Sequence, residues 1–429
     1  MATIAVIGGG PMGLAAAYHL LKQGHTVSLY EADKQLGGMS ASFLFNGIRI
    51  ERYYHFICKS DQPLFEMLAE LGIDDALRWR ETRMGYFFQG RLRDWGEPFA
   101  LLRFPGLGLV SKFRYGLLAF TSTKRSDWRK LDGIDAVTWL QRWVGQQAYD
   151  VLWRPLFELK FHQYTPNLSA AWIWSRLKRV GTSRKNLLQE EMGYLEGGSD
   201  TFLNAIAANI IAMGGRIFLS EAVDEVVISD GRLQGVRTHT GRHAFDRVIS
   251  TIPMPYVSAM VPGLPGSIRD RYDAVNNIAV VCVLVHLREA LTPYFWLNIS
   301  DPDIDIPGFI EYSNLNALGG HIVYAPFYIP GEHPDFQRDD DFFIAKVRRY
   351  LLAVNPGLDE TGILKIAAGR YRYAQPICQP EFASCLPPIS PGVDGLYIAD
   401  TSYYYPEDRS ISESIKLGKM LAAMAASGC

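Results

Sequence analysis

Cysteine is scarce in this chain: only five occur among 429 residues, and none belongs to a Cys-x-x-Cys pair. An odd number without paired spacing argues against a disulfide framework and a zinc site, so we expect no metal and a reducing, cytoplasmic environment. Long hydrophobic runs are also absent, since none reaches the roughly eighteen residues of a membrane-spanning helix. The apolar N-terminus lacks the basic start of a secretory signal, because the first lysine is Lys22.

A dominant charge of one sign is missing as well. The chain carries 43 Lys and Arg against 45 Asp and Glu, a formal net charge of −2. Such a balance creates no global attraction for nucleic acid or for an anionic surface. We therefore expect no nucleic-acid partner. An apolar content of 48% is enough to bury a large core, and the length suggests two to three domains.

Glycine, by contrast, is concentrated near the start of the chain. An apolar strand over residues 3–7 runs into Gly-Gly-Gly-Pro-Met-Gly and then into an alanine-rich helix. In a dinucleotide-binding turn, the first glycine makes the tight turn, the second admits a pyrophosphate, and the third allows close helix–strand packing. The helix N-terminus adds free N–H groups for the phosphates. The predicted cofactor contacts in this turn are Gly8, Gly10, Pro11, Met12 and Gly13.

A second strand, residues 26–30, ends at Glu31, which selects among dinucleotides. Its carboxylate can accept hydrogen bonds from both ribose hydroxyls of an adenosine, and its charge would repel a 2′-phosphate. Residues 37–40, Gly-Gly-Met-Ser, resemble the G-G-x-[ST] element of FAD proteins of the glutathione-reductase type, where it helps to hold the pyrophosphate. The sequence therefore predicts FAD as cofactor, with contacts from Gly37, Gly38, Met39 and Ser40 as well as Glu31.

The rest of the chain alternates between helical and β-rich composition. Tryptophans recur at helical spacing in one stretch, and short alternating strands with a Ser-Asp-Gly-Arg turn follow it. We predict an α/β fold in which residues 1–57, 191–255 and 386–429 form a Rossmann-like FAD-binding domain, a parallel sheet plus a β-meander. Residues 58–190 and 256–385 are expected to form the helical and β-sheet parts of an interleaved α+β substrate domain.

The assembled motifs resemble those of a superfamily that contains the FAD-dependent amine oxidases, protoporphyrinogen oxidases and phytoene and other carotenoid desaturases. Besides the N-terminal motifs, the matching segments are 194–198, 248–253 and 396–400. The resemblance implies that the backbone of Val223 contacts the adenine and that Asp400 holds the ribityl or pyrophosphate portion. It also implies that the last helix begins near Ile411 and Ser412, facing the pyrimidine end of the flavin. Thr251, within the second matching segment, is a further expected contact.

The same resemblance implies a function: hydride removal by flavin N5 from a small or lipid-linked organic substrate, as in a protoporphyrinogen oxidase-like oxidoreductase. A simple amine oxidase is disfavoured, because the second position of the aromatic cage in that group falls at Ser410. The chain also resembles proteins encoded near bacterial surface-polysaccharide genes, which implies a carbohydrate or lipid-linked sugar substrate. A non-catalytic flavoprotein that binds a partner is a further alternative.

A narrower resemblance points to UDP-galactopyranose mutases, in which reduced FAD acts as a nucleophile without net redox change. Residues 403–409 are similar to the tyrosine-and-aspartate loop of those enzymes, and residues 54–61 to their histidine segment beside the flavin. The mutase loop places an arginine between its tyrosines, and this chain has none there. Diphosphate recognition would then require an arginine from elsewhere, such as Arg370 or Arg372.

Four residues are candidates for catalysis, each with a plain structural alternative. His55 suits proton transfer near neutral pH, unless it is a core or surface histidine. Glu311 would be a base if its strand faces the flavin, and a solvated strand end otherwise. Arg372 would bind an anionic substrate, or simply be exposed. Tyr404 belongs to a hydroxyl-rich loop that would line the pocket or fill core.

Residues 91–130 are rich in basic, aromatic and leucine side chains. This composition suits peripheral contact with anionic lipid through residues 99–121, at the inner face of a membrane, or entry of a lipid-linked substrate. The alternative is a helical substrate domain with a solvated basic side, which we favour. We expect a monomer or a homodimer.

Overall fold

A five-stranded parallel sheet forms one half of the protein. The computed structural model describes residues 1–186 and 189–427. The strand order is β10-β2-β1-β14-β20, and every neighbouring pair is parallel. Segments far apart in the chain therefore meet in one sheet, as the α/β prediction requires. The strands are β1 (Thr3–Ile7), β2 (Thr26–Tyr30), β10 (Arg216–Phe218), β14 (Arg247–Ser250) and β20 (Leu396–Ile398).

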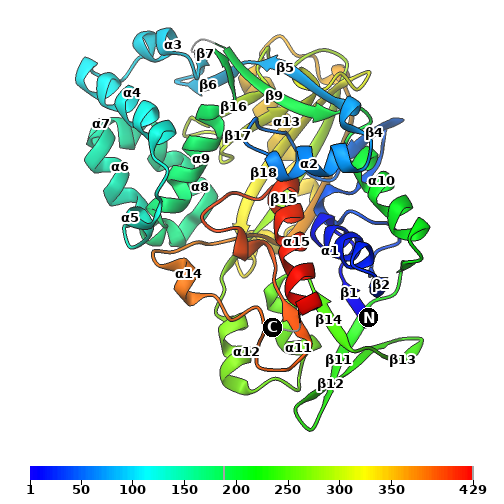
Figure 1. Cartoon of the computed structure of the whole chain (residues 1–429). Coiled ribbons are helices and arrows are strands. Elements are labelled where there is room, and N and C mark those ends of the chain that lie inside the picture. The colour runs from blue at the N-terminus through cyan, green and yellow to red at the C-terminus, as the bar shows by residue number, and fades with distance from the viewer. Residues whose placement is uncertain (187–188, 428–429) are drawn as a thin grey trace.

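Helix α1 (Pro11–Lys22) packs against both α10 (Ser199–Ala212) and α15 (Ile411–Ser427) (Figure 1). The approach of α1 and α15 is close, since a Cβ placed on Gly418 would lie 2.4 Å from the Met12 carbonyl oxygen. A meander of β11 (Val223–Ser229), β12 (Arg232–Thr238) and β13 (Gly241–Ala244) extends from this half as an antiparallel sheet. Both predicted parts of the FAD-binding fold, parallel sheet and meander, are present.

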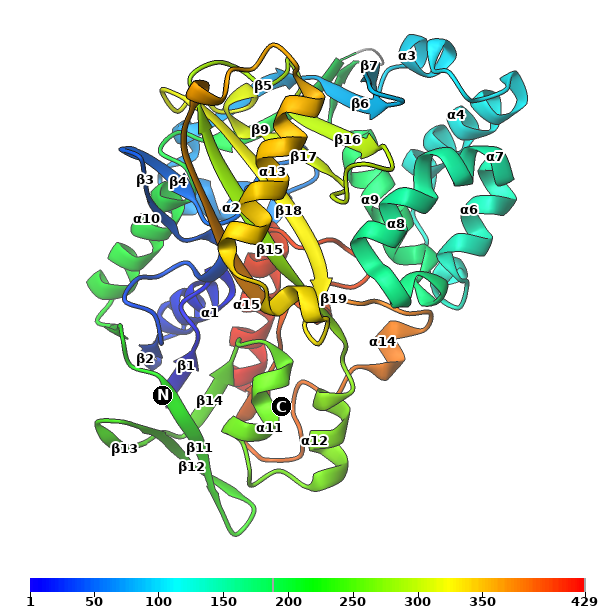
Figure 2. The ribbon, with the colours of Figure 1, turned by 180° about the vertical axis from the view of Figure 1, so that it is seen from behind.

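The second half is built on a seven-stranded mixed sheet in the order β19-β15-β18-β17-β16-β6-β7. Helix α13 (Asp340–Val354) covers one face (Figure 2). The buried aliphatic strand β15 pairs with both β18 and β19, and these three long strands form the main part of the sheet. The other strands are β6 (Met84–Phe88), β7 (Arg91–Trp95), β15 (Asn277–Leu287), β16 (Trp296–Ser300), β17 (Gly308–Glu311), β18 (His321–Pro330) and β19 (Ile363–Pro376).

The segment 58–190 is less helical than the aromatic spacing suggested. It contributes β6 and β7 to the mixed sheet, joined by a hairpin whose turn residues Gln89 and Gly90 have φ of 52° and 67°. Two positive φ values are typical of the tight turns that match strand twist. The sequence lacks the usual Asn-Gly or Asp-Gly signal there. A separate sheet contains β5 (Leu77–Thr82), β8 (Arg184–Asn186) and β9 (Gln189–Leu195).

The helical layer occupies one side of the molecule (Figure 1). It comprises α3 (Pro98–Arg103), α4 (Leu109–Lys124), α5 (Arg129–Asp132), α6 (Ala136–Val144), α7 (Gln146–Ala148), α8 (Arg154–Phe161) and α9 (Ala170–Thr182). A π-helical turn, Tyr149–Trp153, precedes α8. The remaining elements are α2 (Gln62–Glu70), β3 (Ser42–Phe45), β4 (Ile48–Glu51), α11 (Val257–Met260), α12 (Gly266–Asp273) and α14 (Phe382–Cys385).

Candidate active site

A cavity of about 770 Å³ is lined by residues of both sheets. Its lining begins at the carboxyl end of β1 and reaches β15, β18 and β19 of the mixed sheet. Ligands of parallel α/β sheets bind at this edge, where the strands end and the loops diverge. The cavity therefore connects the predicted cofactor turn with the predicted substrate domain.

The glycine turn after β1 has the shape that a pyrophosphate needs. Gly8 has φ +104°, a conformation open to glycine, and its N–H donates to the Tyr30 carbonyl over 2.9 Å. A Cβ on Gly10 would meet no atom within 4 Å, whereas a Cβ on Gly13 would lie 1.9 Å from the Gly8 carbonyl oxygen. Gly8, Gly10, Pro11 and Met12 line the cavity, and Gly13 instead lets α1 approach β1.

Glu31 stands at the end of β2 and reaches the same cavity. One carboxylate oxygen accepts the Gly9 N–H over 2.6 Å and the other accepts the Asp33 N–H over 2.8 Å. The Gly37 N–H donates to the Gly9 carbonyl over 2.8 Å, which ties the second glycine element to the first. The four residues of that second element, Gly37, Gly38, Met39 and Ser40, all line the cavity.

The expected contacts from the later segments reach the same cavity. Val223, Thr251, Asp400, Ile411 and Ser412 all line it, although they come from different elements. Asp400 braces two loops, because one oxygen accepts the Met254 N–H and the other the Ser402 N–H, each over 2.9 Å. Burial raises the pKa of Asp400.

These residues fit an FAD. The space over Gly10 is open where a pyrophosphate would lie against the N-terminus of α1. The same cavity is lined by the meander residue Val223 and by the start of α15. Backbone groups and a carboxylate at the adenosine end, and a helix N-terminus at the other, are the donor set that a flavin dinucleotide requires.

His55 lines the cavity with its ring held on both sides. Nδ1 lies 2.9 Å from a Glu51 carboxylate oxygen, and Nε2 lies 3.3 Å from the Ser40 hydroxyl. Glu51 is itself anchored, since its other oxygen accepts the Ser199 N–H over 2.8 Å. A carboxylate on one nitrogen fixes the orientation of an imidazole ring. The arrangement can hold or move a proton at Nε2.

Glu311 does not lie in the cavity, so the structure corrects its prediction as a base at the flavin. Its side chain is 1% exposed and closes the loop before β16, accepting N–H groups of Leu291 over 2.9 Å and Thr292 over 2.8 Å. The neighbouring Tyr312 reaches the cavity instead. The strand was identified correctly, but its last residue turns the carboxylate towards the loop.

Glu311 should make stability depend on pH. Burial raises its pKa from 4.5 to about 7, so folding favours the protonated acid. Its contribution is complete below pH 4.5 and is lost as the pH rises through about 7. Relative to Glu311→Gln, the free energy of unfolding of the wild type should fall by about 3 kcal/mol across that interval. Urea unfolding of both proteins measures the difference, and a difference that does not vary with pH would contradict the assignment.

Arg372 also lies outside the cavity, which corrects its prediction as a substrate ligand. It pairs with Glu332 on the surface, and Arg370 pairs with Asp340. The alternation along β19 was predicted, but the face that lines the cavity is the one with Tyr371 and Tyr373. Solvated ion pairs hold the arginines on the other face.

Of the three successive tyrosines, only Tyr404 lines the cavity. Its hydroxyl bonds to the Ser414 hydroxyl over 2.7 Å, and burial raises its pKa. The Tyr403 hydroxyl donates to the Pro387 carbonyl over 2.6 Å, and that of Tyr405 lies 2.6 Å from the Ser169 hydroxyl. One tyrosine of the loop therefore lines the cavity, and the other two hold the loop against neighbouring segments.

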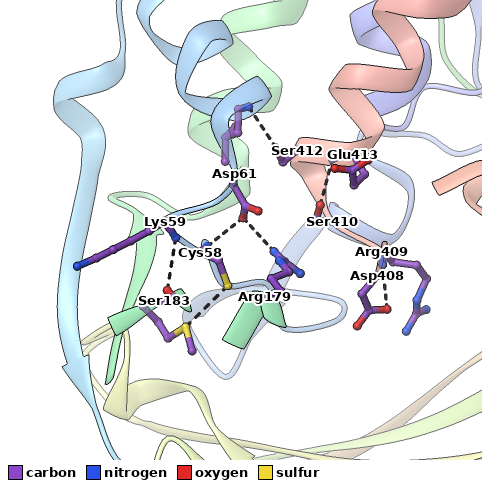
Figure 3. Close-up of polar contacts among 12 residues, drawn as sticks. Cys58, Lys59, Asp61, Arg179, Ser183, Asp408, Arg409, Ser410, Ser412 and Glu413 are labelled. Atoms are coloured by element: carbon purple, nitrogen blue, oxygen red, sulfur yellow. Dashed lines mark hydrogen bonds and ion pairs between the residues drawn. The ribbon is translucent and has the colours of Figure 1, made fainter. Parts of the chain in front are cut away.

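Two carboxylates of the cavity lining, Asp61 and Asp408, form ion pairs with arginines of α9, and this group was not among the predicted site residues. Asp61 accepts hydrogen bonds from Arg179 and from the Cys58 N–H, each over 2.9 Å (Figure 3). Asp408 pairs with Arg176 over 2.9 Å. Burial would raise the pKa of Asp408, but the surrounding cations hold it well below its usual range. The spacing of Arg176 and Arg179, three residues apart on one helix, is the signal that could have found this group.

The family model described as flavin containing amine oxidoreductase matches residues 13–367. The 15-cis-phytoene desaturase of Synechococcus elongatus is 22% identical over 284 residues, 60% of this chain and 59% of that protein. Protoporphyrinogen oxidase 2 of Arabidopsis thaliana is 28% identical over 159 residues, 35% of this chain and 31% of that protein.

Matches to curated relatives span about a sixth to three fifths of the length of those proteins. Among solved structures, reduced UDP-galactopyranose mutase superposes with a TM-score of 0.75 over 100% of this chain and 96% of its own, at 17% identity. Identity at that level shows a shared fold alone.

Proposed function

The chain belongs to the flavin-containing amine oxidoreductase family, with FAD as its cofactor, and on that premise we propose its reaction. It is an FAD-dependent oxidoreductase that removes a hydride from a small or lipid-linked organic substrate. The observation that carries the proposal is that one and the same cavity is lined by the cofactor turn and by aromatic side chains. When bound, FAD supplies the acceptor for the hydride. Among the aromatic side chains that line the cavity are Tyr54, Phe56, Trp296, Tyr328 and Tyr371.

The residues of this chain would perform three tasks in that reaction. The aromatic walls orient an organic substrate and exclude water from it. His55, oriented by Glu51, takes up or returns the proton that accompanies the oxidation. Ser410 and the first turn of α15 border the cavity, where a helix N-terminus stabilises negative charge.

Reoxidation of the reduced holoenzyme by dissolved oxygen tests the proposal. Rapid reoxidation in a stopped-flow experiment, with peroxide release, would support an oxidase and justify screening amines, porphyrinogens and alcohols. Slow reoxidation together with reduction of quinone-like acceptors would support a dehydrogenase. Failure of every organic donor to bleach the oxidised flavin anaerobically would overturn the oxidoreductase.

A redox-neutral isomerase acting on a glycosyl diphosphate is the second candidate. Cationic side chains at the substrate end of the cavity favour it, as does the likeness to a UDP-galactopyranose mutase. Reduced holoenzyme should then convert UDP-sugars without consuming oxygen. Conversion by the oxidised form alone would argue against this candidate.

We also propose that α3 and α4 contact a membrane from the cytoplasmic side. Residues 98–126 contain five Lys and Arg and no Asp or Glu. Apolar side chains rimmed by cations suit the interface of an anionic bilayer. Among the residues that the structure covers, no helix is long and apolar enough to cross a membrane. The large apolar side chains on the two helices that are 42% to 79% exposed are Phe99, Leu102, Leu109, Val110, Phe113, Leu117 and Phe120.

Vesicle co-sedimentation should reveal this contact. We expect binding to phosphatidylglycerol vesicles and little to phosphatidylcholine. Phe113→Asp should weaken the partition about tenfold, since it removes one large exposed apolar group that would enter the bilayer interface. Ile211→Asp is the matched control, because Ile211 is 60% exposed on α10, away from the two helices. Equal binding of Phe113→Asp and the wild type would show that these helices are merely a solvated surface.

A further inference from the structure

Lys160 is a cation of the cavity wall that lacks a carboxylate partner. It lies on α8, and its Nζ is 4.9 Å from the centroid of the Tyr328 ring and 5.7 Å from that of Phe161. Within residues 1–186 and 189–427, no Asp or Glu oxygen lies within ion-pairing distance of this Nζ. A lysine in such a place is normally paired. Its ammonium faces an open space instead.

The fold holds Lys160 in this place by a strained connection. His162, two residues later, has φ +48°, and its Nε2 lies 2.6 Å from the Tyr328 carbonyl oxygen. The end of α8 is therefore tied to β18, the strand that carries the Tyr328 ring beneath the ammonium. Backbone strain of this kind persists where the surrounding structure supports it, often at functional sites.

The nearby carboxylates are already engaged by other cations. Asp408 is paired with Arg176, and Asp61 with Arg179. Arg409, which also lines the cavity, donates to two neutral groups, the Ala374 carbonyl and the Gln375 side-chain oxygen.

The buried Nε of Arg409 has no hydrogen-bond partner among the described atoms. Lys160, Arg176, Arg179 and Arg409 all lie close enough to Asp408 to lower its pKa. Four cations thus share the two carboxylates Asp61 and Asp408, and positive charge is in excess. Burial, together with Arg176, lowers the pKa of Lys160 well below its usual value.

We propose that Lys160 and Arg409 form a subsite for an oxyanion of the substrate, a phosphate or a carboxylate. The Tyr328 ring stands beside Lys160, and Tyr54 lines the same cavity. An ammonium and a guanidinium that converge on one space bind phosphate and carboxylate oxygens by charge-assisted hydrogen bonds. An incoming oxyanion supplies the counter-charge that the wall lacks. The inference rests on the proposed function, because it names the class of substrate that the same cavity takes.

Calorimetric titration of the oxidised holoenzyme with inorganic pyrophosphate and with malonate tests the subsite. FAD fills its own phosphate turn, so saturable binding reports the substrate end. We expect at least one probe to bind, and Lys160→Met to weaken that binding at least about tenfold, the usual loss for one charge-assisted bond. Lys419→Met, an exposed lysine on α15, should leave it unchanged. Pyrophosphate binding alone would identify a phosphate-bearing substrate, and malonate binding alone a carboxylate.

Two results would overturn the subsite. One is the absence of saturable binding of either probe to wild-type holoenzyme in the millimolar range. The other is unchanged affinity in Lys160→Met that retains its FAD. The first needs no variant, so a folding defect cannot hide it. The assay requires no turnover, so the two proposals fail separately: if no organic donor reduces the flavin but a probe still binds, the oxidoreductase is refuted and the subsite stands.

Discussion

Replacing Gly10 with alanine is expected to raise the Kd for FAD about a hundredfold, equivalent to about 2.8 kcal/mol. The backbone there has φ −72° and ψ 174°, which alanine adopts readily, and the added methyl would meet no protein atom within 4 Å. That empty volume is where the pyrophosphate must approach the backbone. Stability of the apoprotein should change by about 1 kcal/mol or less, the usual cost at a helix N-cap.

Gly13→Ala is the matched variant, and it should lower the stability of the apoprotein, which Gly10→Ala should leave nearly unchanged. Its Cβ would lie 1.9 Å from the Gly8 carbonyl oxygen, a backbone atom that can move only if α1 separates from β1. We expect the apoprotein to lose about 3 kcal/mol or more of unfolding free energy. Quenching of flavin fluorescence measures FAD affinity, and urea unfolding measures apoprotein stability. Wild-type FAD affinity in Gly10→Ala would show that the dinucleotide does not lie over this turn.

The second large effect is expected from Arg179→Met. The Arg179–Asp61 pair is buried, with side chains 11% and 8% exposed. Removing the guanidinium leaves the Asp61 carboxylate buried and, among the residues that the structure describes, with the Cys58 N–H as its one remaining partner. Breaking a buried pair in this way costs about 3–5 kcal/mol. The expected result is a loss of that size in urea unfolding of the FAD-saturated protein.

Two controls separate this effect from general damage. Arg83→Met removes one partner of the Arg83–Asp94 pair, whose side chains are 57% and 59% exposed, and should cost about 1 kcal/mol or less. The double variant Asp61→Asn with Arg179→Met should recover part of the loss, because no unpaired charge remains. An Arg179→Met protein as stable as Arg83→Met would mean that the cavity hydrates Asp61 freely.

Local motifs of the sequence predicted the cofactor end well. The turn after β1, the acid at the end of β2 and the second glycine pair are short segments whose conformation depends on neighbours in the chain. The spacing of these residues along the chain is enough to predict the site that they form. The prediction of FAD and of an α/β fold is confirmed by the family match and by the structural neighbours. The hairpin of β6 and β7 was missed, because Gln89-Gly90 is an unusual turn and pairing with β16 lies far away in sequence.

The positions of the side chains at the proposed substrate end depend on tertiary contacts, which the spacing of residues along the chain does not predict. Alternation along β19 separates Tyr371 from Arg372 but does not reveal which face meets the cavity. Glu311 was on a predicted strand, yet loop residues twenty positions earlier capture its carboxylate. Lys160 carries no local signal; only the approach of α8 to β18 makes it an unpaired cation of the wall.

By itself, the sequence determined the cofactor and the fold class, because both follow from backbone conformations that glycine and short apolar strands impose locally. Only the tertiary structure decided which charged groups face the cavity. Burial and ion pairing are properties of the assembled chain: Asp61, Asp408, Arg179 and Arg176 neutralise one another across long sequence separations. The excess positive charge of Lys160 and Arg409 can be recognised only in the folded chain, where the pairs of Asp61 with Arg179 and of Asp408 with Arg176 are formed.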